Sequence, residues 1–170
     1  MPTDEEARLF EDMMACREVI FRICLGFTRN PADAEDLCQD VYLKAYGRLA
    51  GLRQPSSVKE WLYRVARTTC LDHAKRRRVL RLFESSGRPE AALDPRTPEA
   101  SALTKERLSL LKAAISRLPE KQREVFILRE YGRLSYEELG RAVGAKAGTV
   151  MSRLNRARAA VARWIKEGGT

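Results

Sequence analysis

Residues 30–78 constrain the fold most, because an acidic helical pattern is followed there by a basic one. Asn30 and Pro31 predict the start of the first helix, since Asn is a favoured capping residue and Pro fits the first helical position. Apolar side chains then recur every three or four residues over 34–49, and again over 58–70. Both segments are therefore predicted to be amphipathic helices with one buried face.

The charge of the chain is unevenly distributed. The net charge is +9, but residues 46–81 contain 10 basic and 2 acidic side chains, and residues 111–170 contain 13 and 6. Two basic blocks are typical of a protein that touches nucleic acid at two places. The alternative is that each block is only a solvated helix face.

The composition indicates neither secretion nor catalysis. Residues 4–6 are acidic where a signal peptide needs a basic segment, and no apolar run approaches membrane length, so we expect a cytoplasmic protein without membrane contact. The four cysteines lack Cys-x-x-Cys spacing and are predicted to be buried thiols. Cys70 and His73 lie one helical turn apart, but without a second pair we predict no metal site. A nucleophile motif and a phosphate loop are also missing, so we predict no enzyme and no cofactor.

The remaining patterns predict an all-α fold of two small helical domains. The first domain covers residues 4–80 and begins with one long helix over residues 4–29. A linker rich in Pro, Ser and acidic residues follows over 81–102. The second domain covers residues 103–167. Its third helix is predicted to start at a capping box formed by Ser135 and Glu138.

The second domain also contains a helix, a glycine turn and a basic helix. The helix that precedes this motif is predicted to begin at Pro119 and to end at Gly132, a C-cap. Gly144 turns the chain, and the helix that follows carries Arg153 and Arg156 on its outer side. This is the helix-turn-helix arrangement, whose second helix enters the major groove of DNA. A helical hairpin that binds no DNA is the structural alternative.

Four short runs carry a resemblance to a known family. The runs AEDLCQDVYLKA (34–45) and WLYRVAR (61–67) resemble region 2 of the extracytoplasmic-function (ECF) sigma factors of the sigma-70 family. The runs LSYEELG (134–140) and GTVMSRLNRAR (148–158) resemble region 4 of the same family. The resemblance implies a subunit that directs RNA polymerase to −10 and −35 promoter elements. The alternative is a helix-turn-helix regulator with an N-terminal sensor or dimerisation domain, which would leave the first two runs unexplained.

The resemblance implies partners as well as a function. Region 2 would bind the β′ clamp helices of core RNA polymerase, and the β flap is a further expected contact. An acidic face with an exposed leucine fits such an interface. The residues expected there are Asp33, Asp36, Gln39, Asp40 and Leu43. Promoter DNA is the second partner, and the resemblance leaves open an anti-sigma factor as a third.

The −10 element is expected to meet the basic helix and the loop before it. By position, Leu52 and Thr68 would hold an unstacked base, although the family commonly has Asn in place of Thr68. Trp61 lies on the apolar stripe and is interpreted as core. Other side chains are predicted to face outward and to contact phosphates and the single strand: Tyr63, Arg64, Arg67, Lys75, Arg76, Arg77 and Arg78.

The −35 element is expected to meet the second helix of the helix-turn-helix. Thr149, Ser152 and Arg153 are the predicted base contacts, and Lys146, Arg156 and Arg158 the predicted phosphate contacts. Lys146 stands where the family usually has a capping Ser or Thr, and Ala147 where a Glu is common. By position, the 81–102 segment would thread through the polymerase active-site cleft.

Overall fold

The computed structural model describes residues 4–49, 51, 57–83 and 102–168, and these form eight α-helices and no strand. The all-α prediction is therefore confirmed for this part of the chain. None of these helices is long and apolar enough to cross a membrane. The helices are α1 (Asp4–Ala15), α2 (Arg17–Thr28), α3 (Pro31–Leu49), α4 (Val58–Phe83), α5 (Ala102–Arg117), α6 (Glu120–Glu130), α7 (Tyr136–Val143) and α8 (Ala147–Lys166).

The starts of α3 and α4 are fixed by the predicted caps. The Asn30 side chain accepts a hydrogen bond from the backbone N–H of Asp33 at 3.1 Å, and the Ser57 hydroxyl accepts one from the N–H of Glu60 at 3.3 Å. Each bond satisfies a donor that the first turn of a helix leaves without an intrahelical partner. Pro31 occupies the first position of α3, as predicted.

The prediction of one long helix over residues 4–29 is wrong. The chain breaks at Cys16, which has φ −87° and ψ 0°, so that α1 and α2 are separate helices. The Cys16 N–H bonds to the Met13 carbonyl three residues back, at 3.0 Å, rather than four. The local turn is thereby tightened, while the apolar spacing that suggested one helix continues across the break.

The C-terminal unit begins with α5 and contains the predicted helix-turn-helix. The Ser135 and Glu138 capping box is present at the start of α7, and Gly144 ends that helix with φ +65°. Gly132, however, is not a helix cap, because the left-handed residue after α6 is Arg133. A Cβ at Gly132 would lie 2.8 Å from Cγ1 of Ile23 on α2, so the glycine instead permits a close approach between the two units.

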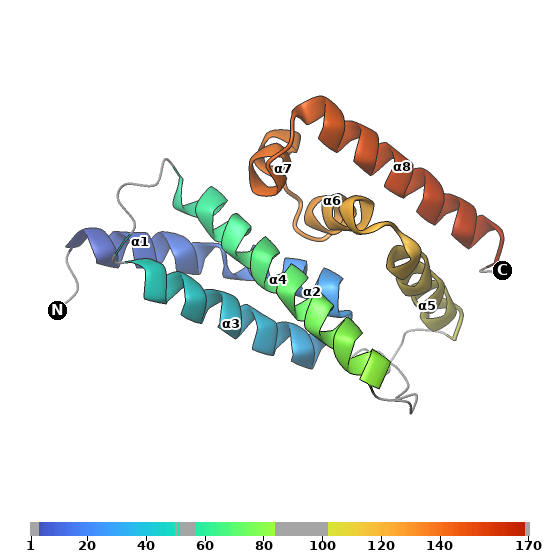
Figure 1. Cartoon of the computed structure of the whole chain (residues 1–170), viewed down its shortest axis with the longest axis horizontal. Coiled ribbons are helices and arrows are strands. Elements are labelled where there is room, and N and C mark those ends of the chain that lie inside the picture. The colour runs from blue at the N-terminus through green and yellow to red at the C-terminus, as the bar shows by residue number, and fades with distance from the viewer. Residues whose placement is uncertain (1–3, 50, 52–56, 84–101, 169–170) are drawn as a thin grey trace.

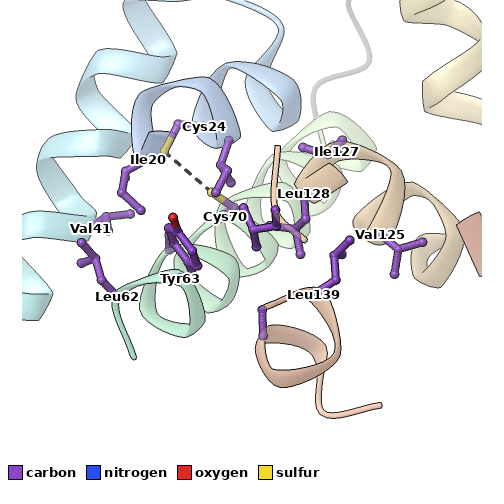
Figure 2. Close-up of a cluster of buried hydrophobic side chains, with 14 of the residues drawn as sticks. Ile20, Cys24, Val41, Leu62, Tyr63, Cys70, Val125, Ile127, Leu128 and Leu139 are labelled. Carbon is purple, nitrogen blue, oxygen red and sulfur yellow. Dashed lines mark hydrogen bonds between the residues drawn. The ribbon is translucent and has the colours of Figure 1, made fainter. Parts of the chain in front are cut away.

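Helix α4 is the centre of the molecule. It packs against α1, α2 and α3 on one side and against α7 on the other, and α2 also packs against α6 (Figure 1). Buried side chains of both units belong to one hydrophobic cluster, in which Tyr63 and Cys70 of α4 lie between Ile20 of α2 and Leu128 of α6 (Figure 2). The N-terminal and C-terminal units are thus in direct contact.

The predicted boundaries of the linker differ from the helix ends. Helix α4 continues through Phe83 and α5 already begins at Ala102, so residues 81–83 and 102 are helical. The rest of the predicted linker, residues 84–101, lies outside the described residues.

Candidate functional site

The outer face of α3 has the predicted acidic character. Asp36, Gln39 and Asp40 are exposed, and Leu43 is 70% exposed. Asp33 differs from them, because its carboxylate forms an ion pair with Arg77 of α4 at 2.7 Å. Of the five residues expected to contact the polymerase, four are therefore available on one face, and the fifth is held by a residue expected to contact DNA.

This face borders an apolar groove that sequence reasoning missed. The groove has a volume of about 1020 Å³ and lies between α3 and the helices α1 and α2, with Gln39 and Leu43 on its edge. The rings of Phe10 and Tyr46 meet edge to face across it, with their centroids 6.2 Å apart. Exposed large apolar side chains that cluster in this way mark interaction sites. The groove could have been anticipated from Phe10 and Tyr46 only if the packing of α1 on α3 had been known.

The basic face of α4 is only partly as predicted. Arg64, Thr68, Lys75, Arg76 and Arg78 are exposed along one side of the helix. Leu52, the expected partner of Thr68, lies outside the described residues.

The prediction that Tyr63 faces outward is wrong. Tyr63 is 2% exposed, because α4 is covered on both sides and α7 occupies the side that the sequence pattern left open. Burial raises the pKa of its hydroxyl, against the opposing charge of Lys59. The Lys59 ammonium lies 5.7 Å from the centroid of the Tyr63 ring. Trp61 is half-buried against the hydrophobic core, in agreement with its interpretation as a core residue.

Arg67 is also turned away from solvent. Its guanidinium forms an ion pair with Glu124 of α6, whose side chain is 1% exposed. Two more ion pairs join α4 to α7: Lys59 with Glu138 at 2.7 Å, and Glu60 with Arg141. Part of the surface predicted to bind DNA is therefore the contact surface between the two units.

Thr68 is exposed on α4, but its hydroxyl forms a hydrogen bond within the helix. The Oγ1–H donates to the carbonyl of Arg64, one turn earlier, at 2.8 Å. A hydroxyl carries a single hydrogen, so only its acceptor lone pairs can face a ligand.

The outer face of α8 agrees with the prediction for a recognition helix. Lys146, Thr149, Ser152 and Arg156 are exposed, and Arg153 is half-buried. Arg158 is held by Glu130 of α6 at 2.6 Å. Lys146 is the capping residue of α8 and its side chain makes no capping hydrogen bond. The helix lies at the outer edge of the molecule, with its N-terminus next to α7 (Figure 1).

The four cysteines are buried free thiols, as predicted. The Sγ atoms of Cys24 and Cys70 lie 3.8 Å apart (Figure 2). Within the described residues, no group of three or more His, Cys, Asp or Glu side chains is arranged to hold a metal ion.

Both units match descriptions of one protein family. Residues 13–79 match sigma-70 region 2, and residues 108–161 match sigma-70 region 4. The two matches occur in the order and at the places that the sequence motifs indicated. An N-terminal sensor or dimerisation domain is therefore not supported, because that unit is region 2.

Relatives and solved structures give the same result. The chain is 33% identical to the RNA polymerase sigma-H factor of Pseudomonas aeruginosa over 153 residues, which are 84% of this chain and 78% of the relative. It is 35% identical to the ECF RNA polymerase sigma-E factor of Escherichia coli K12 over 140 residues, or 76% of this chain and 72% of the relative. The structure of the sigma factor RpoE in complex with the anti-sigma factor NepR from Bartonella quintana aligns with a TM-score of 0.67 at 26% identity, covering 96% of this chain and 97% of the other.

Sigma factors of this kind are initiation factors without catalytic activity of their own, and they act by binding core RNA polymerase and promoter DNA. The chain belongs to the extracytoplasmic-function group of the sigma-70 family of RNA polymerase sigma factors.

Proposed function

We propose that the outer face of α3 binds the β′ clamp helices of core RNA polymerase, while α4 and α8 bind the −10 and −35 promoter elements. The observation that supports this division is the exposure of Leu43 on an otherwise acidic face of α3. An apolar centre with a polar rim suits a protein interface, whereas a row of guanidinium groups suits phosphates.

At the −10 element, α4 contributes affinity through Arg64, Lys75, Arg76 and Arg78, which contact the uniformly charged phosphate backbone of DNA. Base selection belongs to Thr68 and to Leu52. Strand opening then needs no catalytic group, because trapping an unstacked base offsets the few kcal/mol lost on unpairing it. Arg67 can join this surface only after its ion pair with Glu124 is broken.

At the −35 element, Thr149, Ser152 and Arg153 near the start of α8 read base edges, and Lys146 and Arg156 contact phosphates. Arg158 would have to leave Glu130 to do the same. This division between base contacts and phosphate contacts follows from the geometry of helix-turn-helix proteins, in which the N-terminal residues of the recognition helix reach the bases.

We also propose a location and two further partners for this protein. Sigma factors meet polymerase and chromosomal DNA in the cytoplasm, which we propose as the location of this protein. We propose an anti-sigma factor as its regulator, since the similar RpoE structure is a complex with the anti-sigma factor NepR. The β flap is a further proposed contact of the C-terminal unit.

The docking surface can be tested by pull-down of core RNA polymerase with Asp40→Arg and Leu43→Arg. Both variants should lose most of the bound polymerase, because each places a cation on the acidic and apolar face. Ser109→Arg is the matched control for Leu43→Arg, since it adds the same charge at an exposed site on α5. Binding of polymerase by both α3 variants at the level of the parent would show that the docking surface lies elsewhere.

A further inference from the structure

A second cavity lies between the two units and has not entered the proposed function. Its volume is about 350 Å³, and it is enclosed by the end of α2, the C-terminal half of α4, and α5 and α6. Of the described residues that line it, five are arginines and none is acidic. Its polar wall consists of Arg29, His73, Arg77, Arg78, Arg81 and Arg123.

Contacts from both units hold three of these arginines in place. Arg29 follows α2 with φ +57°, a backbone region that few residues other than Gly adopt, and its Nη1 donates to the Lys112 carbonyl of α5 at 3.1 Å. Arg123 of α6 donates to the Ser116 carbonyl at 3.1 Å. Arg77 is fixed by Asp33 at 2.7 Å. The cationic wall is thus assembled by the packing of the two units.

The positive charges that line this cavity repel one another. Burial, together with the positive charges of Arg29 and Arg78, lowers the pKa of Arg123 despite the opposing carboxylate of Glu120. Burial also lowers the pKa of His73, with a contribution from Arg77, although Asp33 and Asp40 oppose it. The Nε2 atom of His73 is buried and has no hydrogen-bonding partner among the described residues. A bound anion would neutralise part of this crowded positive charge.

We propose that this cavity binds a small anion carrying two or more phosphoryl groups, such as the diphosphate of a nucleotide. The planar guanidinium group matches phosphate oxygens in a bidentate manner, so several converging arginines favour phosphoryl groups over carboxylates. A volume of about 350 Å³ lies at the lower end of the range for small-molecule sites, which suits a compact ligand. A diphosphate offers these arginines more negative charge and more oxygen acceptors than one orthophosphate does.

The site has a consequence for the promoter surface. The ligand contacts α4 on one side and Arg123 of α6 on the other, so it stabilises the packing of the two units. It also covers Arg78, which the proposed function assigns to DNA. The ligand and promoter DNA therefore bind competitively. This second statement rests on the proposed function, whereas the anion site itself does not.

The test is isothermal titration of the full-length chain with pyrophosphate, with orthophosphate and sulfate as comparison anions at equal ionic strength. Pyrophosphate should bind one to one and more tightly than either comparison anion. Arg123→Gln should weaken pyrophosphate at least about tenfold, the scale of one lost charge-assisted hydrogen bond. Lys121→Gln removes the same charge from an exposed site on the same helix and should change binding by less than about twofold.

Two further measurements keep the outcomes distinct. Arg81→Gln lies on the exposed end of α4 and should also weaken pyrophosphate, which covers the case that Arg123→Gln does not fold. Neither variant should change binding to a promoter duplex by more than about twofold. The inference is overturned if sulfate binds as tightly as pyrophosphate, if Lys121→Gln loses as much as Arg123→Gln, or if Arg123→Gln weakens promoter DNA as strongly as pyrophosphate. The last result would mean that the cavity binds the DNA backbone. None of the three substitutions should change the amount of core polymerase in the pull-down.

Discussion

Arg67 of α4 and Glu124 of α6 form an ion pair that links the two units, and the Glu124 side chain is 1% exposed. A carboxylate that is removed from water in this way is stable only while its partner stays in place. The pair therefore couples the packing of region 4 to the position of a basic side chain in region 2. Any movement that frees Arg67 for DNA must also hydrate Glu124.

The first prediction concerns the energetic weight of this pair. Arg67→Met should lower the free energy of unfolding by about 3 kcal/mol, because it leaves the Glu124 carboxylate buried without a cation. The double variant Arg67→Met with Glu124→Leu should recover most of the loss, since both charges are then removed. Urea unfolding followed by circular dichroism measures both.

Arg64→Met is the control, because Arg64 is exposed on the same helix and should cost less than about 0.5 kcal/mol. If Arg67→Met is no more destabilising than Arg64→Met, the two units do not depend on this ion pair.

Local signals in the sequence predicted the helices well. Asn30, Ser57 and Ser135 each cap a helix at the predicted residue, because a capping side chain bonds to a backbone group only a few residues away. The exposed face of α3 was predictable for the same reason, since the spacing of its apolar side chains depends on that helix alone.

The environment of α4 was not predictable from its own pattern. Tyr63 and Arg67 are covered by α7 and α6, which lie more than fifty residues further along the chain. A single helical pattern shows which side of a helix is most apolar, but it does not show whether a second unit covers another side. The same limit applies to the groove beside α3 and to the arginine cavity, which exist only in the packed molecule.

The second prediction tests the contact between α2 and α6. A Cβ at Gly26 would lie 2.5 Å from Cγ2 of Ile127 and 3.0 Å from the Tyr131 ring, closer than carbon atoms tolerate. Gly26→Ala should therefore push α6 away from α2 and separate the two units. Small-angle X-ray scattering should detect a larger radius of gyration than that of the parent.

Gly47→Ala provides the matched control for that measurement. Gly47 lies on α3 with no atom within 4 Å of an added Cβ, so the alanine should leave the radius unchanged. It should also raise stability by up to about 1 kcal/mol through its higher helix propensity. An unchanged radius for Gly26→Ala would mean that the helices adjust locally and that the units stay packed.

The third prediction separates two effects of Lys146. The residue has the extended backbone of a helix cap, with φ −66° and ψ 150°, but its side chain makes no capping bond. Lys146→Ser should add about 1 kcal/mol to the free energy of unfolding by capping α8. The same change should weaken binding to the −35 element and reduce the salt dependence by about one unit, because one phosphate contact is lost.

Ala147→Ser is the control for Lys146→Ser, since it places a hydroxyl one residue too late to cap and leaves the cation intact. Salt titrations of binding to a −35 duplex measure the slope for both variants. An unchanged slope for Lys146→Ser would remove Lys146 from the phosphate contacts while leaving the capping effect as a separate result.

The last prediction concerns selection of the −10 element by Thr68. Its hydroxyl hydrogen is already donated to the Arg64 carbonyl at 2.8 Å, so the side chain can only accept a hydrogen bond from a base. An Asn at this position would present both a donor and an acceptor. Thr68→Asn should therefore sharpen the preference at one −10 base, by about 1 kcal/mol or more.

In vitro transcription from a promoter library measures this preference directly. Thr68→Val should weaken the preference at the same base, because valine lacks the oxygen that can accept a hydrogen bond from that base. Replacing residues 49–58 with the corresponding segment of a relative of known preference should transfer that preference, since Leu52 lies in this segment. Arg76→Ala should instead lower transcription evenly across the library, because an exposed arginine on α4 contacts only the phosphate backbone of DNA. A segment replacement that leaves the preference unchanged, together with an unaltered preference in Thr68→Asn, would move −10 base selection to a different part of region 2.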